Sequence, residues 1–279
     1  MVHMSDLLRE WSKSATAWRR HSATIRTMFT PLTTALIEEA RISEGQSVLD
    51  VAGGPGEPSL TIAEAVGPKG TVTYTDAVAE MVAAAEEEGK RRGLTNVRFQ
   101  QTVAESLQFA DNSFDASVSR LGVMLFSDPT AALREMLRVT KPQGALCFVV
   151  WGSNERNPFT STVSKVIGRF VDTPPEDPDA PGAFRFAEPG KLARLLTEAG
   201  AENVRERELN FRIAAPISID EFWQMRSATS GTLREKLATL PPEKAQQVGQ
   251  EVQDAVREFF PDNQMSFPAQ MLLVSGRSL

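Results

Sequence analysis

Two aspartates and a glycine-rich turn in the first third of the chain have types and spacing suited to ligand binding. Asp50 ends a short apolar run and precedes a turn that contains Gly53, Gly54 and Gly56. Glycines at such a turn allow positive φ and a close approach of the backbone to a ligand. Asp76 follows about 20 residues later, where a carboxylate can accept hydrogen bonds from both hydroxyls of a ribose. The pattern therefore indicates a ligand with an adenosine-like ribose.

Two ligand classes carry such a ribose, dinucleotides and S-adenosylmethionine, and the glycine pattern alone does not separate them. A dinucleotide lays its pyrophosphate on free N–H groups at a helix N-terminus. Pro55 and Pro58 lack that N–H group, and Glu57 adds negative charge at the same place. A turn with acids and few donors favours the sulfonium and ammonium groups of S-adenosylmethionine. The alternative is that Glu57 only stabilises the helix dipole and points away.

The elements that must position these residues alternate between strand and helix. Residues 5–40 predict helices, and the strands that follow are predicted at 47–51, 71–76, 97–101, 114–120 and 145–151. Helices are predicted between them at 58–66, 77–93 and 129–139, the last with Asp128 as its cap and Pro129 in its first turn. This order predicts an α/β fold with a doubly wound, mostly parallel sheet and helices on both faces.

The pattern changes after Trp151. Residues 152–190 are rich in Pro, Gly and Asp and indicate a loop or lid, whereas residues 216–262 predict helices. A helix at 191–200 and strands at 202–211 and 269–278 complete a seven-stranded sheet. We therefore expect an N-terminal helical cap at 1–40 and a domain at 41–279, with lid insertions at about 152–190 and 216–262 that pack over the ligand edge.

The composition of the chain disfavours several classes of function. The 279 residues carry a net charge of −6, which disfavours a nucleic-acid partner because phosphate contacts need a basic face. Cys147 is the only cysteine and lies in an apolar run, so we expect a buried thiol and no metal site. No apolar stretch reaches about 18 residues, and the N-terminus has no signal-peptide core. A cytoplasmic protein without a membrane span is expected, and the sequence does not indicate its oligomeric state.

Three segments resemble motifs of class I S-adenosylmethionine-dependent methyltransferases. VLDVAGGPG (48–56) resembles the first motif, although Ala52 stands where the family often has its first glycine. An alanine tolerates that place only if its φ stays negative. TYTDAVAEMVAAAEE (73–87) resembles the second motif. Residues 103–146 resemble the remaining motifs of the ubiquinone/menaquinone-biosynthesis C-methyltransferase-like (methyltransferase type 11) group, so the resemblance spans about residues 45–151.

The resemblance implies a Rossmann-like methyltransferase that binds S-adenosylmethionine and needs no metal. It implies transfer of the methyl group to a small molecule by direct displacement. Its cofactor contacts carry over to these positions: Asp50 for the turn and the ammonium group; the backbone of Ala52, Gly53, Gly54 and Gly56 for the methionine part; Asp76 for the ribose; Ala77 and Met81 for the adenine ring; Ala104 and Glu105 for its amino group; and Ser119 and Arg120 toward the sulfonium.

The sequence gives fewer signals for the residues that bind the methyl acceptor. Aromatic, apolar and basic residues near the expected ligand edge suit a hydrophobic or planar acceptor with a polar or anionic group. The candidates are Trp18, His21, Arg120, Met124, Phe126, Trp151 and Trp223. None of them is identified as a catalytic base. Two other classes therefore stay open, namely a non-catalytic regulatory protein that binds an adenosyl cofactor and an NAD-dependent oxidoreductase.

Overall fold

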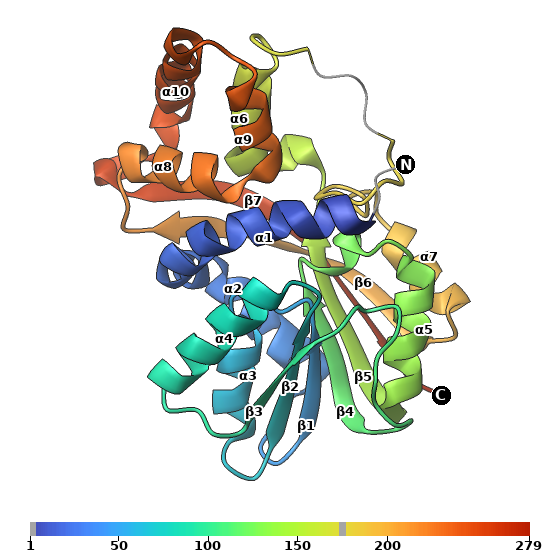
Figure 1. Cartoon of the computed structure of the whole chain (residues 1–279). Coiled ribbons are helices and arrows are strands. Elements are labelled where there is room, and N and C mark those ends of the chain that lie inside the picture. The colour runs from blue at the N-terminus through green and yellow to red at the C-terminus, as the bar shows by residue number, and fades with distance from the viewer. Residues whose placement is uncertain (1–3, 173–176) are drawn as a thin grey trace.

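The computed structural model describes residues 4–172 and 177–279, and seven strands form one sheet in the order β3-β2-β1-β4-β5-β7-β6 (Figure 1). Neighbouring strands run parallel from β3 to β5, and β7 is antiparallel to both β5 and β6. The predicted seven-stranded, mostly parallel sheet is confirmed. The strands are β1 (Ser47–Val51), β2 (Thr71–Asp76), β3 (Val97–Gln101), β4 (Phe114–Arg120), β5 (Thr140–Trp151), β6 (Glu202–Ala215) and β7 (Met265–Arg277).

β5 begins earlier than the sequence predicted. The strand was predicted at 145–151, but Phe114 pairs with Thr140 while Ala116 pairs with Ala145. The extra residues between these pairs form an irregularity, in which Gln143 adopts φ 62°. β6 and β7 are also longer than predicted because each supplies the other with backbone partners from Glu202↔Arg277 to Ala215↔Met265.

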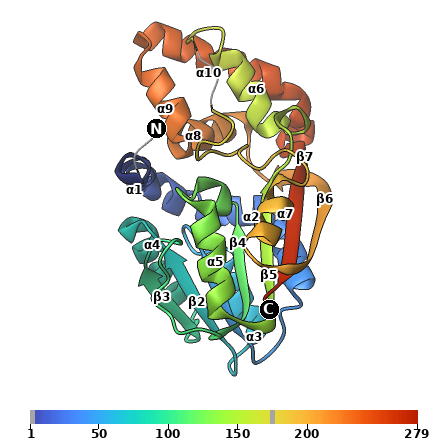
Figure 2. The same cartoon turned by 90° about the vertical axis from the view of Figure 1, so that its right-hand side faces the viewer.

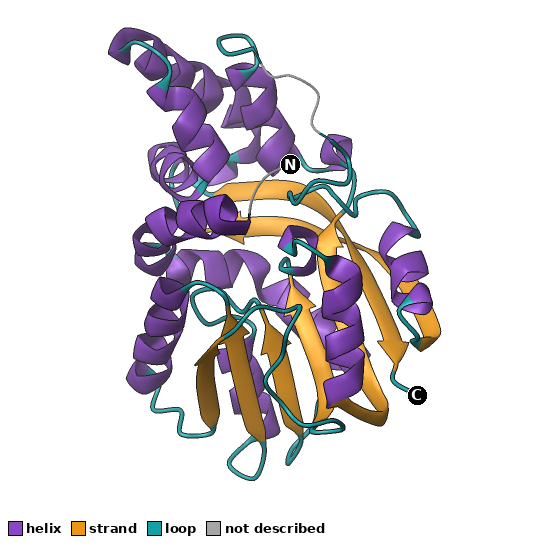
Figure 3. Cartoon of the chain, turned by 45° about the vertical axis from the view of Figure 1, so that its right-hand side comes forward, coloured by secondary structure: helices purple, strands orange, loops and turns teal. Residues whose placement is uncertain are grey.

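Helices pack on both faces of the sheet, as the strand order requires. α3 (Ser59–Val66) follows β1 and α4 (Ala79–Arg91) follows β2, so right-handed connections place both on one face. α5 (Pro129–Val139) connects β4 to β5 in the opposite direction along the sheet. It therefore lies on the other face and contacts α7 (Lys191–Glu198) (Figure 3). The doubly wound arrangement is confirmed, and Asp128 caps α5 by accepting from the Ala131 N–H.

A group of helices, called the helical cover below, lies beyond the carboxyl ends of the parallel strands (Figure 2). It consists of α6 (Pro158–Ile167), α8 (Ile219–Thr229), α9 (Gly231–Ala238) and α10 (Pro242–Val256), and α10 packs against both α6 and α8. The interpretation of 152–190 as a loop was wrong for α6. Its buried Phe159, Val163 and Val166 recur at helical spacing, and the Asn157 side chain bonds the backbone of Gln270 in β7. Residues 173–176 of that segment lie outside the described residues.

The first helix connects the sheet to the helical cover. α1 (Met4–Arg20) contacts α4, α8 and α9 (Figure 1). The Trp18 indole donates to the backbone carbonyl of Thr229 at 3.0 Å. α2 (Ser22–Ala40) packs on β4, β5 and β6, and its Leu32 and Leu36 are fully buried in the main core. The division into a cap at 1–40 and a domain at 41–279 stays a prediction.

Cys147 is fully buried in β5, as expected from its apolar neighbours, and burial raises the pKa of its thiol. Within residues 4–172 and 177–279, no helix combines the length and hydropathy that crossing a bilayer requires.

Candidate active site

One pocket lies at the carboxyl ends of β1, β2, β3 and β4, beneath α1 and α2. Its walls come from the glycine turn after β1, the start of the β2–α4 connection, residues 102–105, and residues 120–127. Helices α1 and α2 supply the remaining side. The sequence-predicted residues that line it are Trp18, Ala52, Gly53, Gly54, Asp76, Ala77, Met81, Ala104, Glu105, Arg120 and Phe126.

Two glycines of the turn differ in the space around them: Gly53 has no room for a side chain, whereas Gly54 faces open space. A Cβ on Gly53 would lie 2.6 Å from the Tyr74 ring and 2.8 Å from Asp50 Oδ2. Gly54 adopts φ 56°, and a Cβ placed on it would meet nothing within 4 Å. The expectation of a negative φ at Ala52 was wrong, because Ala52 adopts φ 61°. A left-handed alanine costs about 1–2 kcal/mol, so the surrounding contacts must hold the turn in this shape.

Asp50 organises the start of α3 from below the pocket surface. Its side chain is fully buried and accepts from the Ser59 N–H at 3.1 Å and the Ser59 hydroxyl at 2.5 Å. Burial raises the pKa of Asp50 to about 7, against the opposing effects of Ser59 and the Arg120 charge. Asp50 is not among the residues that line the pocket, so its carboxylate supports the turn from behind.

Asp76 connects two pocket-forming turns and also faces the pocket. Its Oδ2 accepts from the Gly54 N–H at 3.0 Å, and its Oδ1 accepts from the Val78 N–H at 2.9 Å. Burial raises the pKa of Asp76, and these backbone donors oppose the increase. Each carboxylate oxygen can accept more than one hydrogen bond, so both retain acceptor capacity toward the pocket.

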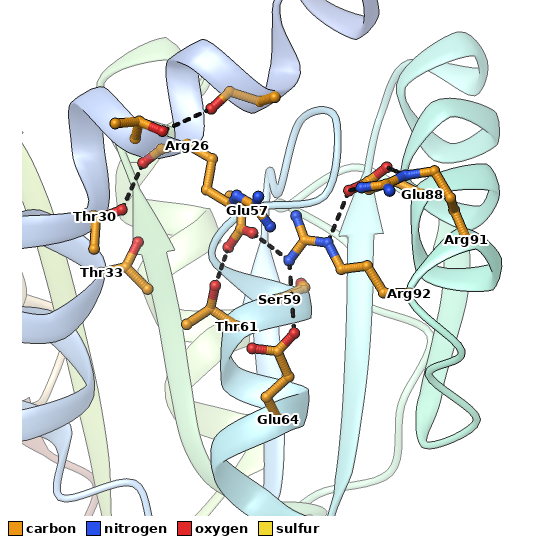
Figure 4. Close-up of polar contacts among 12 residues, drawn as sticks. Arg26, Thr30, Thr33, Glu57, Ser59, Thr61, Glu64, Glu88, Arg91 and Arg92 are labelled. Atoms are coloured by element: carbon orange, nitrogen blue, oxygen red, sulfur yellow. Dashed lines mark hydrogen bonds and ion pairs between the residues drawn. The ribbon is translucent and has the colours of Figure 1, made fainter. Parts of the chain in front are cut away.

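Glu57 does not carry a free charge. Its carboxylate lies 2.7 Å from Nη1 of Arg92 and accepts from the Thr61 hydroxyl (Figure 4). Arg92 also binds Glu88 at 2.8 Å, and all three charged residues line the pocket. The interpretation of this turn as acid-rich was therefore wrong for Glu57, whose partner Arg92 comes from the far end of α4. Pro55 and Pro58 still provide no N–H donor there.

Arg120 extends from the end of β4 into the pocket wall. Its Nη1 donates to Thr33 Oγ1 at 2.8 Å and to the Phe29 carbonyl at 3.5 Å, and its Nη2 donates to the Glu57 carbonyl at 3.2 Å. No carboxylate of the described residues lies within ion-pair distance of this guanidinium. Burial lowers the pKa of Arg120.

Glu105 fixes another part of the wall. Its Oε1 accepts from the N–H groups of Ser127 and Asp128 at 2.9 and 3.2 Å. These bonds connect the segment after β3 to the segment that leads into α5. Glu105 and its neighbour Ala104 therefore lie at a defined side of the pocket.

Several predicted site residues lie away from the pocket wall. Ser119 is fully buried, and a Cβ on Gly56 would meet Leu60. Trp151 packs between Phe29 and Phe159 at ring distances of 6.2 and 6.4 Å. His21 stands at the break between α1 and α2, where burial and Arg20 lower its pKa. The pocket lining does not include Asp50, Gly56, Ser119, His21, Met124, Trp151 or Trp223.

Sequence reasoning missed most of the wall that α1 and α2 supply. Leu8, Trp11 and Trp18 line the pocket at a helical spacing, and Ile25 and Phe29 continue the wall from α2. This apolar stripe was a detectable signal in the sequence. The charged residues Arg26 and Arg92 were not detectable in this way, because only the fold brings them to the glycine turn.

The sheet order, the antiparallel β7 and a pocket above the glycine turn define a Rossmann-like methyltransferase fold. The chain is similar to phosphoethanolamine N-methyltransferase 2 from Haemonchus contortus, with a TM-score of 0.57, 14% identity, and coverage of 94% of this chain and 57% of that one. At this identity the similarity concerns the fold alone. Residues 30–171 match the model of the ubiE/COQ5 methyltransferase family, and the chain belongs to this family.

Two relatives illustrate the extent of the match. The ubiquinone/menaquinone biosynthesis C-methyltransferase UbiE of Bdellovibrio bacteriovorus is 39% identical over 117 residues, which cover 42% of this chain and 49% of that protein. The UbiE protein of Shewanella piezotolerans is 40% identical over 189 residues, which cover 64% and 75%. The chain thus spans about half the length of the first of these relatives.

Proposed function

We propose that the protein transfers a methyl group from S-adenosylmethionine to a small molecule by direct displacement. The observation that carries this proposal is the Asp76 carboxylate, which lies on the pocket wall and is held by the N–H groups of Gly54 and Val78. A carboxylate fixed at the end of β2 is suited to bind both ribose hydroxyls of an adenosyl group. Family membership supports the same cofactor.

The residues around the pocket fit this cofactor. Ala77, Met81, Ala104 and Glu105 line the same pocket. We assign the apolar surface of Ala77 and Met81 to the adenine ring, and Ala104 and Glu105 to its amino group. The open space beside Gly54 allows the methionine part to approach the backbone. The missing N–H groups of Pro55 and Pro58 disfavour a pyrophosphate instead. When bound, the cofactor supplies a methyl group made electrophilic by the sulfonium.

The protein's contribution to this reaction is alignment and exclusion of water. Leu8, Trp11 and Trp18 of α1 lie over the pocket, and Phe29 and Phe126 border it from α2 and the segment after β4. These side chains reduce contact with water and orient the nucleophile toward the methyl carbon. Among the residues that the structure describes, no histidine or cysteine lines the pocket, so we propose an acceptor that presents its nucleophile without a base from His21 or Cys147.

We further propose a hydrophobic or planar acceptor. The aromatic rings of Phe29 and Phe126 favour such a molecule, since flat apolar ligands bind well between aromatic side chains. The relatives named for ubiquinone and menaquinone biosynthesis support an acceptor of this kind.

Calorimetry with S-adenosylhomocysteine, the demethylated cofactor, tests the proposal. The wild-type chain should bind it, and Asp76→Ala should weaken binding by about 100-fold because two ribose hydrogen bonds to a charged acceptor are lost. Asp76→Asn, which keeps one acceptor oxygen, should show an intermediate loss. Glu86→Gln, which removes a partly exposed acid of α4 outside the pocket, serves as the matched control.

Two results would contradict the proposal. The first is a melting temperature raised by NADH and not by S-adenosylhomocysteine, which would indicate an oxidoreductase. The second is tight cofactor binding without methyl transfer to any member of a broad panel of planar acceptors, which would favour a regulatory protein. Transfer of a labelled methyl group to one acceptor would exclude the regulatory alternative.

A further inference from the structure

Arg226 of α8 is a cation that the described residues do not compensate. Within residues 4–172 and 177–279, its guanidinium makes no hydrogen bond and no ion pair. Its Cζ lies over the ring of Phe159, 4.6 Å from the ring centroid. Burial lowers the pKa of Arg226 to about 10, and no neighbouring carboxylate opposes this decrease. The helical cover therefore contains a positive charge whose only described contact of this kind is an aromatic face.

Such a charge is unfavourable unless an anion completes it. A buried N–H group without a partner loses its hydrogen bond to water, and a buried charge without a counter-ion loses more. Nε of Arg226 is fully buried, whereas Nη1 and Nη2, which also lack a partner, keep exposed surface on this half-buried side chain. The two terminal nitrogens carry four N–H groups, and neighbouring pairs of them match the two oxygens of a carboxylate. A ligand can therefore reach the donors that the chain leaves unused.

α8 places Arg226 close to the pocket. The helix lies beyond the carboxyl ends of the parallel strands and beside α1 (Figure 1). Thr229 follows Arg226 by three residues and so lies on the same face of α8. Its carbonyl accepts the hydrogen bond of the Trp18 indole, and Trp18 lines the pocket. The pocket lining does not include Arg226, so the end of an acceptor would reach this guanidinium past the Trp18 indole, with the rest of the molecule in the pocket.

A second series of contacts connects Arg226 to the same wall. The ring of Phe159 stacks on Trp151 at 6.4 Å, and Trp151 meets Phe29 of the pocket wall at 6.2 Å. The surroundings of the guanidinium are therefore aromatic and apolar, which suits a planar ligand that carries one anionic group. α8 also lies outside residues 30–171, so the family match assigns no role to Arg226.

We propose that Arg226 binds a carboxylate on the methyl acceptor, which is then a planar molecule with one anionic end. This inference rests on the proposed function and adds a specificity-determining residue to it. Phe159 acts as a positioning residue, because its ring covers one face of the guanidinium and leaves the N–H groups at the edge for the carboxylate.

Pairs of planar ligands that differ only in charge test the inference. Each pair consists of a hydroxylated benzoate or naphthoate and its neutral carboxamide. Calorimetry measures the binding of both to the full chain saturated with S-adenosylhomocysteine. For at least one pair, the wild-type chain should bind the carboxylate about 10- to 100-fold more tightly than the amide. Arg226→Met should remove most of this preference and change the affinities for the amide and for S-adenosylhomocysteine less than about threefold.

Two further variants and one further measurement sharpen the test. Arg226→Lys keeps the charge without the planar pair of donors, should retain part of the preference, and serves if Arg226→Met does not fold. Because Arg226 has no polar partner to lose, Arg226→Met should not lower the melting temperature of the ligand-free chain. Arg169→Met is the matched control, since Arg169 follows α6 of the helical cover but is exposed and paired with Glu251 at 3.3 Å. This control should keep the full carboxylate preference.

The possible failures are distinguishable. Equal binding of carboxylate and amide in every pair would overturn the anion site and leave the proposed function standing. A preference that survives in Arg226→Met would overturn the assignment to Arg226, and a preference lost in Arg169→Met would show a general effect of positive charge. A lower melting temperature of Arg226→Met, with equal loss of both ligands, would show that Arg226 only supports the fold. Failure of the wild-type chain to bind S-adenosylhomocysteine would instead contradict the proposed function.

Discussion

The sheet half of the molecule (residues 47–151) and the helical cover are held together by different kinds of contact. In the sheet half, backbone groups and short polar side chains fix the pocket, as in the bonds of Asp76 to the Gly54 and Val78 N–H groups. Phe159 and Phe222 of the helical cover form one cluster with Phe260, which follows α10, and with Phe267 of β7, at ring distances of 5.2–5.8 Å. Directional bonds therefore set the shape of one region, and apolar burial stabilises the other.

This difference has a functional consequence. Hydrogen bonds from a tight turn tolerate little displacement, whereas an apolar cluster tolerates exchanges of similar volume. The region proposed to bind the cofactor can therefore stay constant while the helical cover changes. The family match includes the sheet half and α6 but ends at residue 171, so α8, α9 and α10 of the helical cover lie outside it.

The largest expected effect is on the helical cover. Phe222 is fully buried and contacts the rings of Phe159, Phe260 and Phe267. Phe222→Ala should lower the free energy of unfolding by about 3–5 kcal/mol because it leaves a cavity in this cluster. Affinity for S-adenosylhomocysteine should change less than about threefold, since no residue of the cluster lines the pocket. Denaturant unfolding and calorimetry measure the two quantities.

Phe222→Leu is the control for this variant, because it keeps most of the apolar volume. It should cost less than about 1.5 kcal/mol. A large loss of cofactor affinity in Phe222→Ala would contradict the contrast between the two regions. It would show that the helical cover sets the shape of the cofactor pocket through α1.

The second prediction concerns the turn itself. Gly53→Ala places a Cβ within 2.6 Å of the Tyr74 ring and 2.8 Å of Asp50, so it should lower the free energy of unfolding by about 1–3 kcal/mol. Because the turn must shift to relieve this contact, binding of S-adenosylhomocysteine should weaken in parallel. Thermal unfolding and calorimetry on the same preparation provide both measurements.

Gly93→Ala separates steric contact from backbone strain. Gly93 has φ +70° but nothing within 4 Å of an added Cβ, and it lies after α4, outside the pocket lining. This variant should lose about 1 kcal/mol of stability and keep its cofactor affinity. If both variants lower the affinity for S-adenosylhomocysteine equally, global destabilisation rather than a shift of the turn explains the result for Gly53→Ala.

The same contrast explains what the sequence could predict. The bounds of β1, β2, β3, β4 and α5 were predicted correctly because each is set by local signals, such as β-branched runs and the Asp128–Pro129 helix start. α6 was missed because the Pro, Gly and Asp residues around it obscured the buried stripe of Phe159, Val163 and Val166. Its stability as a helix depends on packing against α10, which is not a local signal.

The candidate site shows the same limit. The positions of Gly53, Gly54 and Asp76 on the pocket wall follow from strands that end in turns, so their placement was predictable. The pairing of Glu57 with Arg92 was not, because it depends on the distance between α3 and α4 in the folded chain. The left-handed Ala52 was also missed, since an alanine gives no signal of positive φ.

The smallest expected effect tests whether the strain at Ala52 matters. Ala52→Gly removes the cost of a left-handed alanine, about 1–2 kcal/mol, but adds the greater chain entropy of glycine in the unfolded state. A net gain of about 0.5 kcal/mol in the free energy of unfolding is expected. Ala83→Gly, at an exposed position inside α4, should instead lose about 1 kcal/mol and serves as the control for glycine itself.

If Ala52→Gly is stabilised and binds S-adenosylhomocysteine with unchanged affinity, the turn owes its shape to the bonds of Asp76 and the packing around Gly53. If it is stabilised but binds the ligand several-fold more weakly, the methyl group of Ala52 is itself part of the cofactor surface, and the sheet half then depends on side-chain packing as the helical cover does.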